Sequence, residues 1–475
     1  MPWIEMLILV PLVGAIWSDR MRDPDRARHV SVLFSGFALL CAAGIWIDFV
    51  LLHAREADDH WHFLSRLFDR DVLVIDQLSA PLLFLVALLC FLTALSTLRT
   101  KIKRFSFAWM LVSESLLLAT LSCQEPWGII ALLAIATIPP WLELRGRGKP
   151  TRVYALHACL FVVLMVAGQI FVEMEGLGEM HSMWAIVPLL TAVLMRSGIV
   201  PFHCWMTDLF ENATLGTSIL FLTPITGAYA ATRLVLPIAP DWVLNGIGIV
   251  SLITAVYAAA MSLVQQDARR FFCYLCVSHS ALVLVGLEMV TPIGLTGALC
   301  IWLSVGLALG GFGLTLRALE ARRGRLLLTE FQGLYDHTPN LAMCFAITGL
   351  AAVGFPGTFG FVGTELLVDG AVEAYPYIGV AVVIAAALCG IAVVQAYFKL
   401  FTGTKYTSNV SLMISLRERY SVIALSAMIL IGGLFPQPWV ASRFAAAQDL
   451  LKQRAAISGN QNPPGEHERA YVQAP

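Results

Sequence analysis

The sequence predicts an all-α polytopic membrane protein with about fourteen transmembrane helices. Of its 475 residues, 58% are hydrophobic and only 13% are charged, whereas a soluble domain has about 25% charged residues. The mean hydropathy is +0.76. Apolar runs long enough to span a bilayer recur along the chain, and basic residues gather in every second connection between them.

The expected spans are delimited by the ends of the apolar runs, since about twenty apolar residues cross a bilayer. They lie near residues 2–17, 29–53, 75–98, 104–123, 126–144, 152–173, 182–200, 214–237, 241–264, 270–289, 291–318, 340–372, 375–402 and 419–441. The seventh and the twelfth contain helix-breaking residues near their middle or end, so we expect both to be broken helices.

The spans group into five segments. These are three N-terminal helices (1–103), a first five-helix unit (104–237), a second five-helix unit (238–402), a last helix (403–441) and a polar tail (442–475). Each unit contains one broken helix, and an odd number of spans separates equivalent helices. The two units are therefore expected to be inverted repeats, an arrangement that places ion sites near the breaks.

Loop charge predicts the orientation. The basic residues of the connections after odd-numbered spans are Arg20, Arg22, Arg26, Arg28, Arg99, Lys101, Lys103, Arg104, Arg145, Arg147, Lys149, Arg152, Arg269, Arg270, Arg322, Arg323, Arg325, Lys405 and Arg417. The other connections are poor in basic residues, apart from the mixed-charge segment 54–70. The positive-inside rule places the basic connections in the cytoplasm and both termini outside.

The first break lies in residues 196–218, between two apolar runs. Pro201 lacks an N–H and clashes with the preceding turn, so it interrupts the helix. A break at membrane depth is tolerated only where the freed backbone faces protein or water. Ionisable side chains near such a break usually mark an ion path. Those in this segment are Arg196, His203, Asp208 and Glu211.

A second polar segment opens the tenth span. Asp267, Arg269 and Arg270 form an acidic–basic cluster at its start, and His279 lies deeper in the same apolar run. Histidine has the side chain whose ordinary pKa lies nearest neutrality, so His279 is a candidate for the ion path. Asp267 and Arg269 are candidates as well. The alternative is that Asp267 pairs with an arginine and orients the helix.

The second break lies in the twelfth span, at Gly354-Phe355-Pro356-Gly357. Two glycines and a proline in four residues end a helix. Glu365 follows the break within the apolar run. A carboxylate there either belongs to the ion path or caps the broken helix.

These three segments resemble one family. Residues 196–214 are similar to K-S-x-x-x-P-F-H-x-W-L-P-D-A-x-E-A-P-T of the antiporter-like subunits of respiratory complex I (NADH-quinone oxidoreductase chains L, M and N) and of Mrp-type antiporter subunits. The matching residues are Pro201, Phe202, His203, Trp205, Asp208, Glu211 and Thr214. Residues 267–279 resemble D-x-K-R-x-x-A-Y-S-S-x-x-H, and residues 354–365 resemble G-x-P-G-x-x-G-F-x-G-E.

The resemblance implies a proton-translocating membrane subunit of a complex I-like assembly in an energy-coupling inner membrane. It implies other membrane and hydrophilic subunits as partners and protons or sodium ions as cargo, with electron transfer carried out elsewhere. Two alternatives stay open. One is a cation/proton antiporter or an ion-coupled inorganic carbon uptake subunit with a soluble partner. The other is a degenerate scaffold subunit that pumps nothing.

The sequence departs from the family pattern at the residues that matter most for pumping. The positions of the family's fifth-helix glutamate and seventh-helix lysine are occupied by Ala134 or Ile135 and by Arg196. The family's eighth-helix lysine lines up near Ile225, or with Pro224 or Thr226 one position away. The positions of the eleventh-helix histidine and the twelfth-helix glutamate hold Val305 and Thr364. A buried arginine keeps its proton and needs a counter-charge. We expect Glu114, mid-span on the fourth helix, to pair with Arg196.

Several functions are excluded by what the sequence lacks. It has no dinucleotide, phosphate-loop, haem or cluster-binding motif, so we expect no cofactor and no metal site. Its ten cysteines lie mostly in apolar runs and are expected to be packing residues. With a net charge of −1, it has no nucleic-acid-binding footprint.

Overall fold

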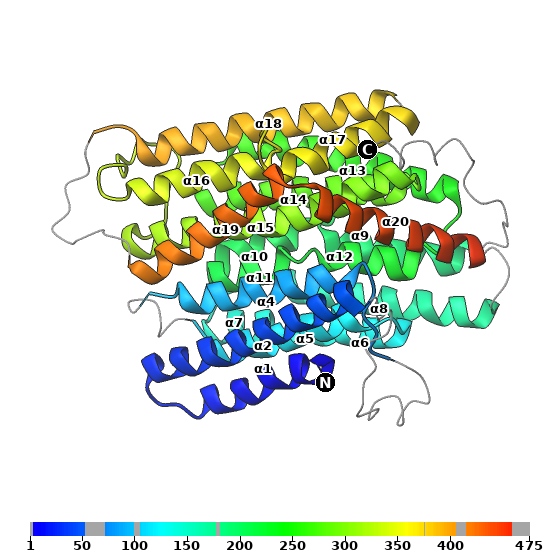
Figure 1. Ribbon diagram of the computed structural model, residues 1–475, viewed down its shortest axis with the longest axis horizontal. Helices are drawn as coiled ribbons and strands as arrows, with labels where there is room; N and C mark the ends of the chain where they lie inside the picture. Colours follow the sequence, from blue (N-terminus) through cyan, green and yellow to red (C-terminus); the bar gives the residue numbers. More distant parts are fainter. Residues whose placement is uncertain are drawn as a thin grey trace.

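The computed structural model describes residues 3–52, 72–98, 105–176, 181–374, 376–404 and 415–457. Within these residues the chain is helical, apart from turns and two isolated β-bridges. Most of the helices run alongside one another in a single bundle (Figure 1). The predicted fold class, an all-α membrane protein, is confirmed.

The first half of the bundle contains short and interrupted helices. It comprises α1 (Trp3–Asp19), α2 (Pro24–Leu52), α4 (Ser79–Leu95), α5 (Phe107–Ser122), α6 (Pro126–Ile135), α7 (Ile138–Gly146), α8 (Arg152–Glu175), α9 (Met183–Ser197), α10 (Cys204–Asn212), α11 (Leu215–Leu222), α12 (Thr226–Ala230) and the π-helix η2 (Ala231–Val235).

The second half contains the longest helices. It comprises α13 (Asp241–Val264), α14 (Ala268–Glu288), α15 (Pro292–Arg323), α16 (Pro339–Ala352), α17 (Phe359–Ala374), α18 (Pro376–Phe401), α19 (Leu416–Leu434) and α20 (Gln437–Ile457).

Eight helical segments among the described residues are long and apolar enough to cross a membrane, and the bent pair α19–α20 would make a ninth. Four further helices are apolar but shorter: α4, α5, α9 and α16. The count of fourteen spans and the inverted repeat therefore stay predictions.

The centre of the bundle is formed by α14 and α15, whose most apolar windows are completely buried. Two glycines show how closely other helices approach α15. A Cβ atom on Gly306 would lie 2.3 Å from Leu85 on α4, and one on Gly297 would lie 2.4 Å from the backbone nitrogen of Leu367 on α17. Larger side chains at these positions would push the helices apart.

Both expected breaks coincide with residues that end helices. After α9, Gly198 adopts a left-handed conformation (φ 71°) as its C-terminal cap, and Pro201 lies before α10 begins. After α16, Gly354 (φ 77°) and Gly357 (φ 86°) flank Pro356 before α17 begins. Each break exposes helix-terminal backbone groups inside the bundle.

The C-terminal region differs from the expectation of one helix followed by a polar tail. The chain bends by 80° after α19, and α20 continues to Ile457. α20 has low average hydrophobicity, but one of its faces is buried at Ala446, Ala447 and Leu450. Its fully buried Arg443 donates to the carbonyl oxygens of Gln77 and Leu78, which precede α4. Average composition concealed this buried face.

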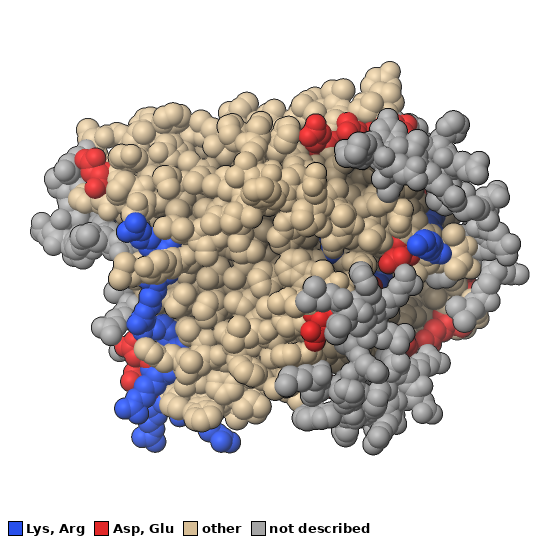
Figure 2. All heavy atoms as spheres, in the orientation of Figure 1, with Lys and Arg blue, Asp and Glu red and all other residues tan. Residues whose placement is uncertain are grey.

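Lysine and arginine gather along one edge of the molecule, at the left of Figure 2. We call this the basic edge and define it by its ion pairs. These are Arg147–Glu143, Arg269–Glu320, Arg270–Glu211, Arg322–Glu418, Arg325–Glu211 and Arg325–Asp267. α14 starts at the basic edge. Its 21 residues extend about 30 Å, so it ends at the opposite edge.

Candidate functional site

Arg196 is buried in the last turn of α9, with 6% of its surface exposed. Its Nε donates to Oγ1 of Thr226 on α12 at 3.1 Å, and its guanidinium carbon lies 3.9 Å from the ring centroid of Phe221. Nη2 has no hydrogen-bond partner among the described residues. A hydroxyl and an aromatic face are therefore what stabilise this cation.

The expected pair of Arg196 with Glu114 is wrong. Glu114, on α5, is fully buried and accepts a hydrogen bond from Ser35 of α2 at 2.8 Å. Among the described residues it forms no ion pair. Depth in the membrane suggested the pair, but this face of α5 packs against α1 and α2, as the bond from Ser115 to the carbonyl of Ile8 (2.8 Å) also shows.

His203 lies between the first break and the basic edge. Its ring is half-buried, with its centroid 5.8 Å from that of Tyr257 and 6.0 Å from that of Tyr274. Its Nδ1 has no partner among the described residues. Asp208, on α10, accepts from Nδ2 of Asn212 at 3.0 Å, and its other oxygen is buried and unbonded. Both side chains thus retain free hydrogen-bonding capacity for water.

Asp267 and Glu211 belong to the ion pairs of the basic edge. Asp267 caps α14 by accepting from the backbone nitrogen of Arg269 at 2.8 Å, and it pairs with Arg325 at 2.5 Å. Glu211 pairs with Arg325 at 3.3 Å and with Arg270 at 3.9 Å. The hydrogen bond from Arg325 to Asp267, supported by Glu211, raises the pKa of Arg325. The arrangement fits the orienting role considered for Asp267.

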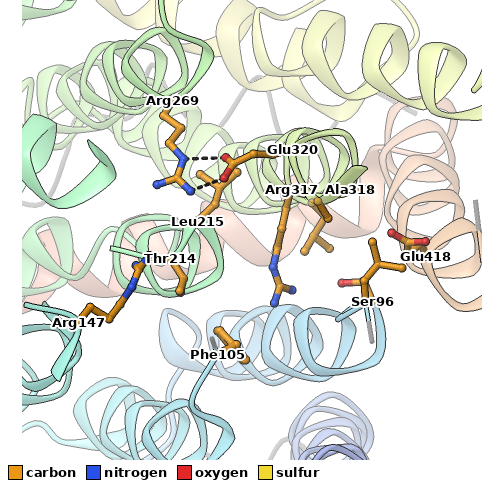
Figure 3. A pocket seen from close by; sticks show the side chains of 13 residues that line it. Ser96, Phe105, Arg147, Thr214, Leu215, Arg269, Arg317, Ala318, Glu320 and Glu418 are labelled. Atoms are coloured by element: carbon orange, nitrogen blue, oxygen red, sulfur yellow. Dashed lines mark hydrogen bonds and ion pairs between the residues drawn. The ribbon is translucent and has the colours of Figure 1, made fainter. Parts of the chain in front are cut away.

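A cavity of about 90 Å³ opens at the basic edge between α4, α11 and α15 (Figure 3). On one side Arg269 makes a two-pronged ion pair with Glu320 and also donates to the carbonyls of Phe210 and Ala213. Each nitrogen of its guanidinium group therefore already donates a hydrogen bond within the protein.

Arg317, on α15, points into this cavity beside Phe105 (Figure 3). It donates to the carbonyl of Thr93 and to Oγ1 of Thr97, both at 2.9 Å. No ion pair joins it to a carboxylate in the described part of the chain. Sequence reasoning missed Arg317 and Glu320. The available signal was a charged residue inside the apolar run 291–318, directly before the basic cluster.

His279 connects α14 to the second break. It is 3% exposed; its Nδ1 lies 2.7 Å from the carbonyl oxygen of Leu275, and its Nε2 lies 2.6 Å from that of Ala352. A carbonyl only accepts, so a neutral imidazole can satisfy one of these contacts and an imidazolium both. Ala352 ends α16, where the helix dipole favours a cation, while burial opposes it. Its surroundings thus favour the charged form in one respect and the neutral form in another.

Glu365 does not lie beside His279. A small cavity at the second break is lined by His279, Ser304 and Thr364, whereas Glu365 is exposed on another face of α17. One residue corresponds to a rotation of about 100° around a helix, which turns the carboxylate away. Glu365 therefore does not line this cavity, and its place in an ion path stays a prediction.

The fold is similar to that of chains in two solved complexes. A chain of respiratory complex I from Thermus thermophilus, solved with bound NADH, superposes with a TM-score of 0.82 at 22% identity, covering 95% of this chain and 99% of that one. A chain of the Mrp complex from Dietzia sp. gives a TM-score of 0.80 at 17% identity and covers 96% and 99%.

Sequence relatives agree with this likeness. NADH-quinone oxidoreductase subunit M of Pseudomonas aeruginosa is 24% identical over 491 aligned positions, covering 92% of this chain and 94% of the relative. NAD(P)H-quinone oxidoreductase chain 4 3 of Trichormus variabilis is 26% identical and covers 77% and 74%. The sequence model of the NADH:quinone oxidoreductase/Mrp antiporter transmembrane family matches residues 153–389. The chain belongs to this family of membrane proteins.

Proposed function

We propose that the chain is a proton-translocating, antiporter-like subunit of a complex I-like assembly in an energy-coupling inner membrane. The relatives named as NADH-quinone oxidoreductase subunits support this assignment. The basic edge would face the cytoplasm and both termini the outside, as the positive-inside rule predicts. The two five-helix units would be inverted repeats, with membrane and hydrophilic partner subunits supplying the redox chemistry.

The proposal rests on the contacts that Tyr274 and His279 make along α14, which we call the polar line of α14. Tyr274 contacts the ring of His203 near the first break, and His279 reaches Ala352 at the second break. Histidine is the side chain best suited to take up and release protons near neutral pH. His203 and His279 would be the switchable groups, with water linking them.

Arg196 would act as a fixed charge. A guanidinium does not lose its proton in proteins, so Arg196 would set the electrostatic potential of the first break without carrying the proton. Asp208 has an unbonded buried oxygen and would contribute to the route near the basic edge. Glu211, Asp267 and Arg269 would hold the helices in place.

A scaffold subunit is the second candidate. It is favoured by two observations: Arg196 has no carboxylate partner among the described residues, and Glu365 is exposed on α17. A cation/proton antiporter with a soluble partner would share the fold of the Mrp chain. Purification in mild detergent, followed by identification of co-purifying subunits, separates a redox assembly from a two-component transporter.

The test of translocation uses the purified assembly in proteoliposomes. Replacing His203 and His279 together by glutamine should lower proton movement by about 10²-fold or more, because general acid–base groups contribute at least that much. Subunit composition should stay unchanged. Full proton movement in the correctly assembled double variant would favour the scaffold.

A further inference from the structure

A buried carboxyl group lies at the end of α14, at the edge opposite the basic edge. Glu288 is the last residue of this helix and is only 5% exposed. Its Oε2 has no hydrogen-bond partner, and the described residues offer Glu288 no ion pair.

Other ionisable groups near this end of the bundle face away. Asp241 on α13, Asp369 and Glu373 on α17, and Tyr377 on α18 are all exposed. The basic side chain in this region that contacts α13 is Arg454, and it is bound to Asp241 at 2.6 Å. Nothing on the described elements packed around α14 therefore neutralises a charge on Glu288.

An ionised Glu288 would be strongly disfavoured. A buried carboxylate without a partner costs several kcal/mol or more. The negative end of the α14 dipole, at the helix C-terminus, opposes a negative charge further. These surroundings therefore favour the protonated, neutral form of the carboxyl group.

The neighbouring face of α13 has no side chain that covers the carboxyl group at Gly248. Gly248 lies beside it, such that a Cβ atom at that position would be 3.7 Å from Oε2. Ser251, one turn deeper on α13, has a fully buried Oγ without a hydrogen-bond partner among the described residues. Buried water commonly supplies the hydrogen bonds that such polar atoms lack.

We propose that Glu288 is a proton-exchanging carboxyl group that connects the polar line of α14 to the edge opposite the basic edge. His279 and Glu288 are nine residues apart on the same helix, or about 14 Å. Water beside Gly248 and Ser251 bridges this gap. The inference rests on the proposed function. It adds Glu288, on α14 itself, as the group that exchanges protons at the edge opposite the basic edge.

Infrared spectroscopy tests the protonation state and water access of Glu288 without relying on transport. The wild-type assembly at pH 7 should show a carboxylic acid C=O band that is absent from Glu288→Gln and that shifts on transfer to deuterated water. An absent band would show that Glu288 is ionised. A band that does not shift would show that it is sealed from water. Either result overturns the proposal.

Transport measurements use three variants. Glu288→Gln keeps the shape of the neutral acid, so the assembly should fold normally, but proton movement should fall by at least about tenfold. Gly248→Ala adds a methyl group without a clash and favours the helix. It should slow deuterium exchange of the Glu288 band and lower proton movement. Glu373→Gln, at the exposed carboxylate of the same edge, should leave both unchanged.

The outcomes separate the two proposals. Wild-type rates in Glu288→Gln and Gly248→Ala would overturn the role of Glu288 and leave the proposed function intact. A wild-type assembly that moves no protons would refute the proposed function. The infrared band would still report whether Glu288 exchanges its proton with water.

Discussion

The two helix breaks of this protein differ in the ionisable side chain that is buried beside them. At the first break, between α9 and α10, a permanent cation is buried against a threonine hydroxyl and aromatic rings. At the second, between α16 and α17, the carboxylate that follows the break faces outward. The ionisable group there is instead His279, supplied by α14.

The ionisable group beside a helix break therefore need not come from the broken segment itself. Arg196 stays charged at every physiological pH, whereas a histidine can change its charge. Translocation should therefore depend on α14 more than on either broken helix. Substitutions at His279, Arg196, Thr226 and Glu365, in order of decreasing expected effect, test this difference.

Replacing His279 should have the largest effect. His279→Ala removes the titratable group and should lower proton movement by about 10²-fold or more. It also leaves the carbonyl of Ala352 unpaired, which should lower the free energy of unfolding by about 1–3 kcal/mol. Proteoliposome assays and thermal unfolding of the purified assembly measure the two effects.

His279→Gln is the matched variant. Glutamine keeps one N–H donor for the carbonyl of Ala352 but cannot titrate, so stability should recover while translocation does not. If both variants pumped at the wild-type rate, the second break would have no proton switch.

Replacing Arg196 should separate transport from stability. In Arg196→Met, a buried cation gives way to an apolar chain of similar length. A buried charge without a paired carboxylate costs several kcal/mol, so the free energy of unfolding should stay unchanged or rise. Proton movement should nevertheless fall by about tenfold, since a fixed charge in a dry site has large electrostatic effects. Strong destabilisation of the variant would instead identify Arg196 as a structural residue.

Thr226→Val should have a smaller effect, confined to stability. It removes the hydroxyl that accepts from Arg196, and a hydrogen bond to a charged group contributes about 1.5–3 kcal/mol. Thr232→Val is the control on the same segment, because that buried hydroxyl donates only to the nearby carbonyl of Tyr229. Equal melting temperatures for the two variants would show that Thr226 does not stabilise the cation.

The sequence was sufficient for the fold class and for the positions where helices are interrupted. Apolar length reports membrane spans, and proline and glycine act locally on the backbone at Pro201 and at Gly354–Gly357. Side-chain partners were harder to predict. Depth along a helix placed Glu114 level with Arg196, but the direction each faces depends on helix packing, which no local pattern encodes.

Long-range contacts explain the remaining differences. Arg443 anchors α20 to carbonyl oxygens more than 360 residues earlier in the chain. Local composition does not encode such a contact, so this polar segment was predicted to be part of a tail. Glu288 and Arg317 lie near the ends of apolar runs, where charged residues normally reach solvent. Their burial follows from the central positions of α14 and α15.

Glu365→Gln should have the smallest effect. The carboxylate is exposed on α17, while Thr364 faces the cavity beside His279. Proton movement should therefore change by less than about twofold, since Glu365 contacts none of the side chains proposed for the proton path. Thr364→Val is the matched change on the cavity side: it removes the hydroxyl that donates to the carbonyl of Gly360 at 2.9 Å and should lower stability by about 0.5–1.5 kcal/mol. A large loss of proton movement in Glu365→Gln alone would mean that the outer face of α17 carries protons, against a partner subunit or lipid. The second break would then have its own titratable group after all, and the contrast with the first break would reduce to arginine against glutamate.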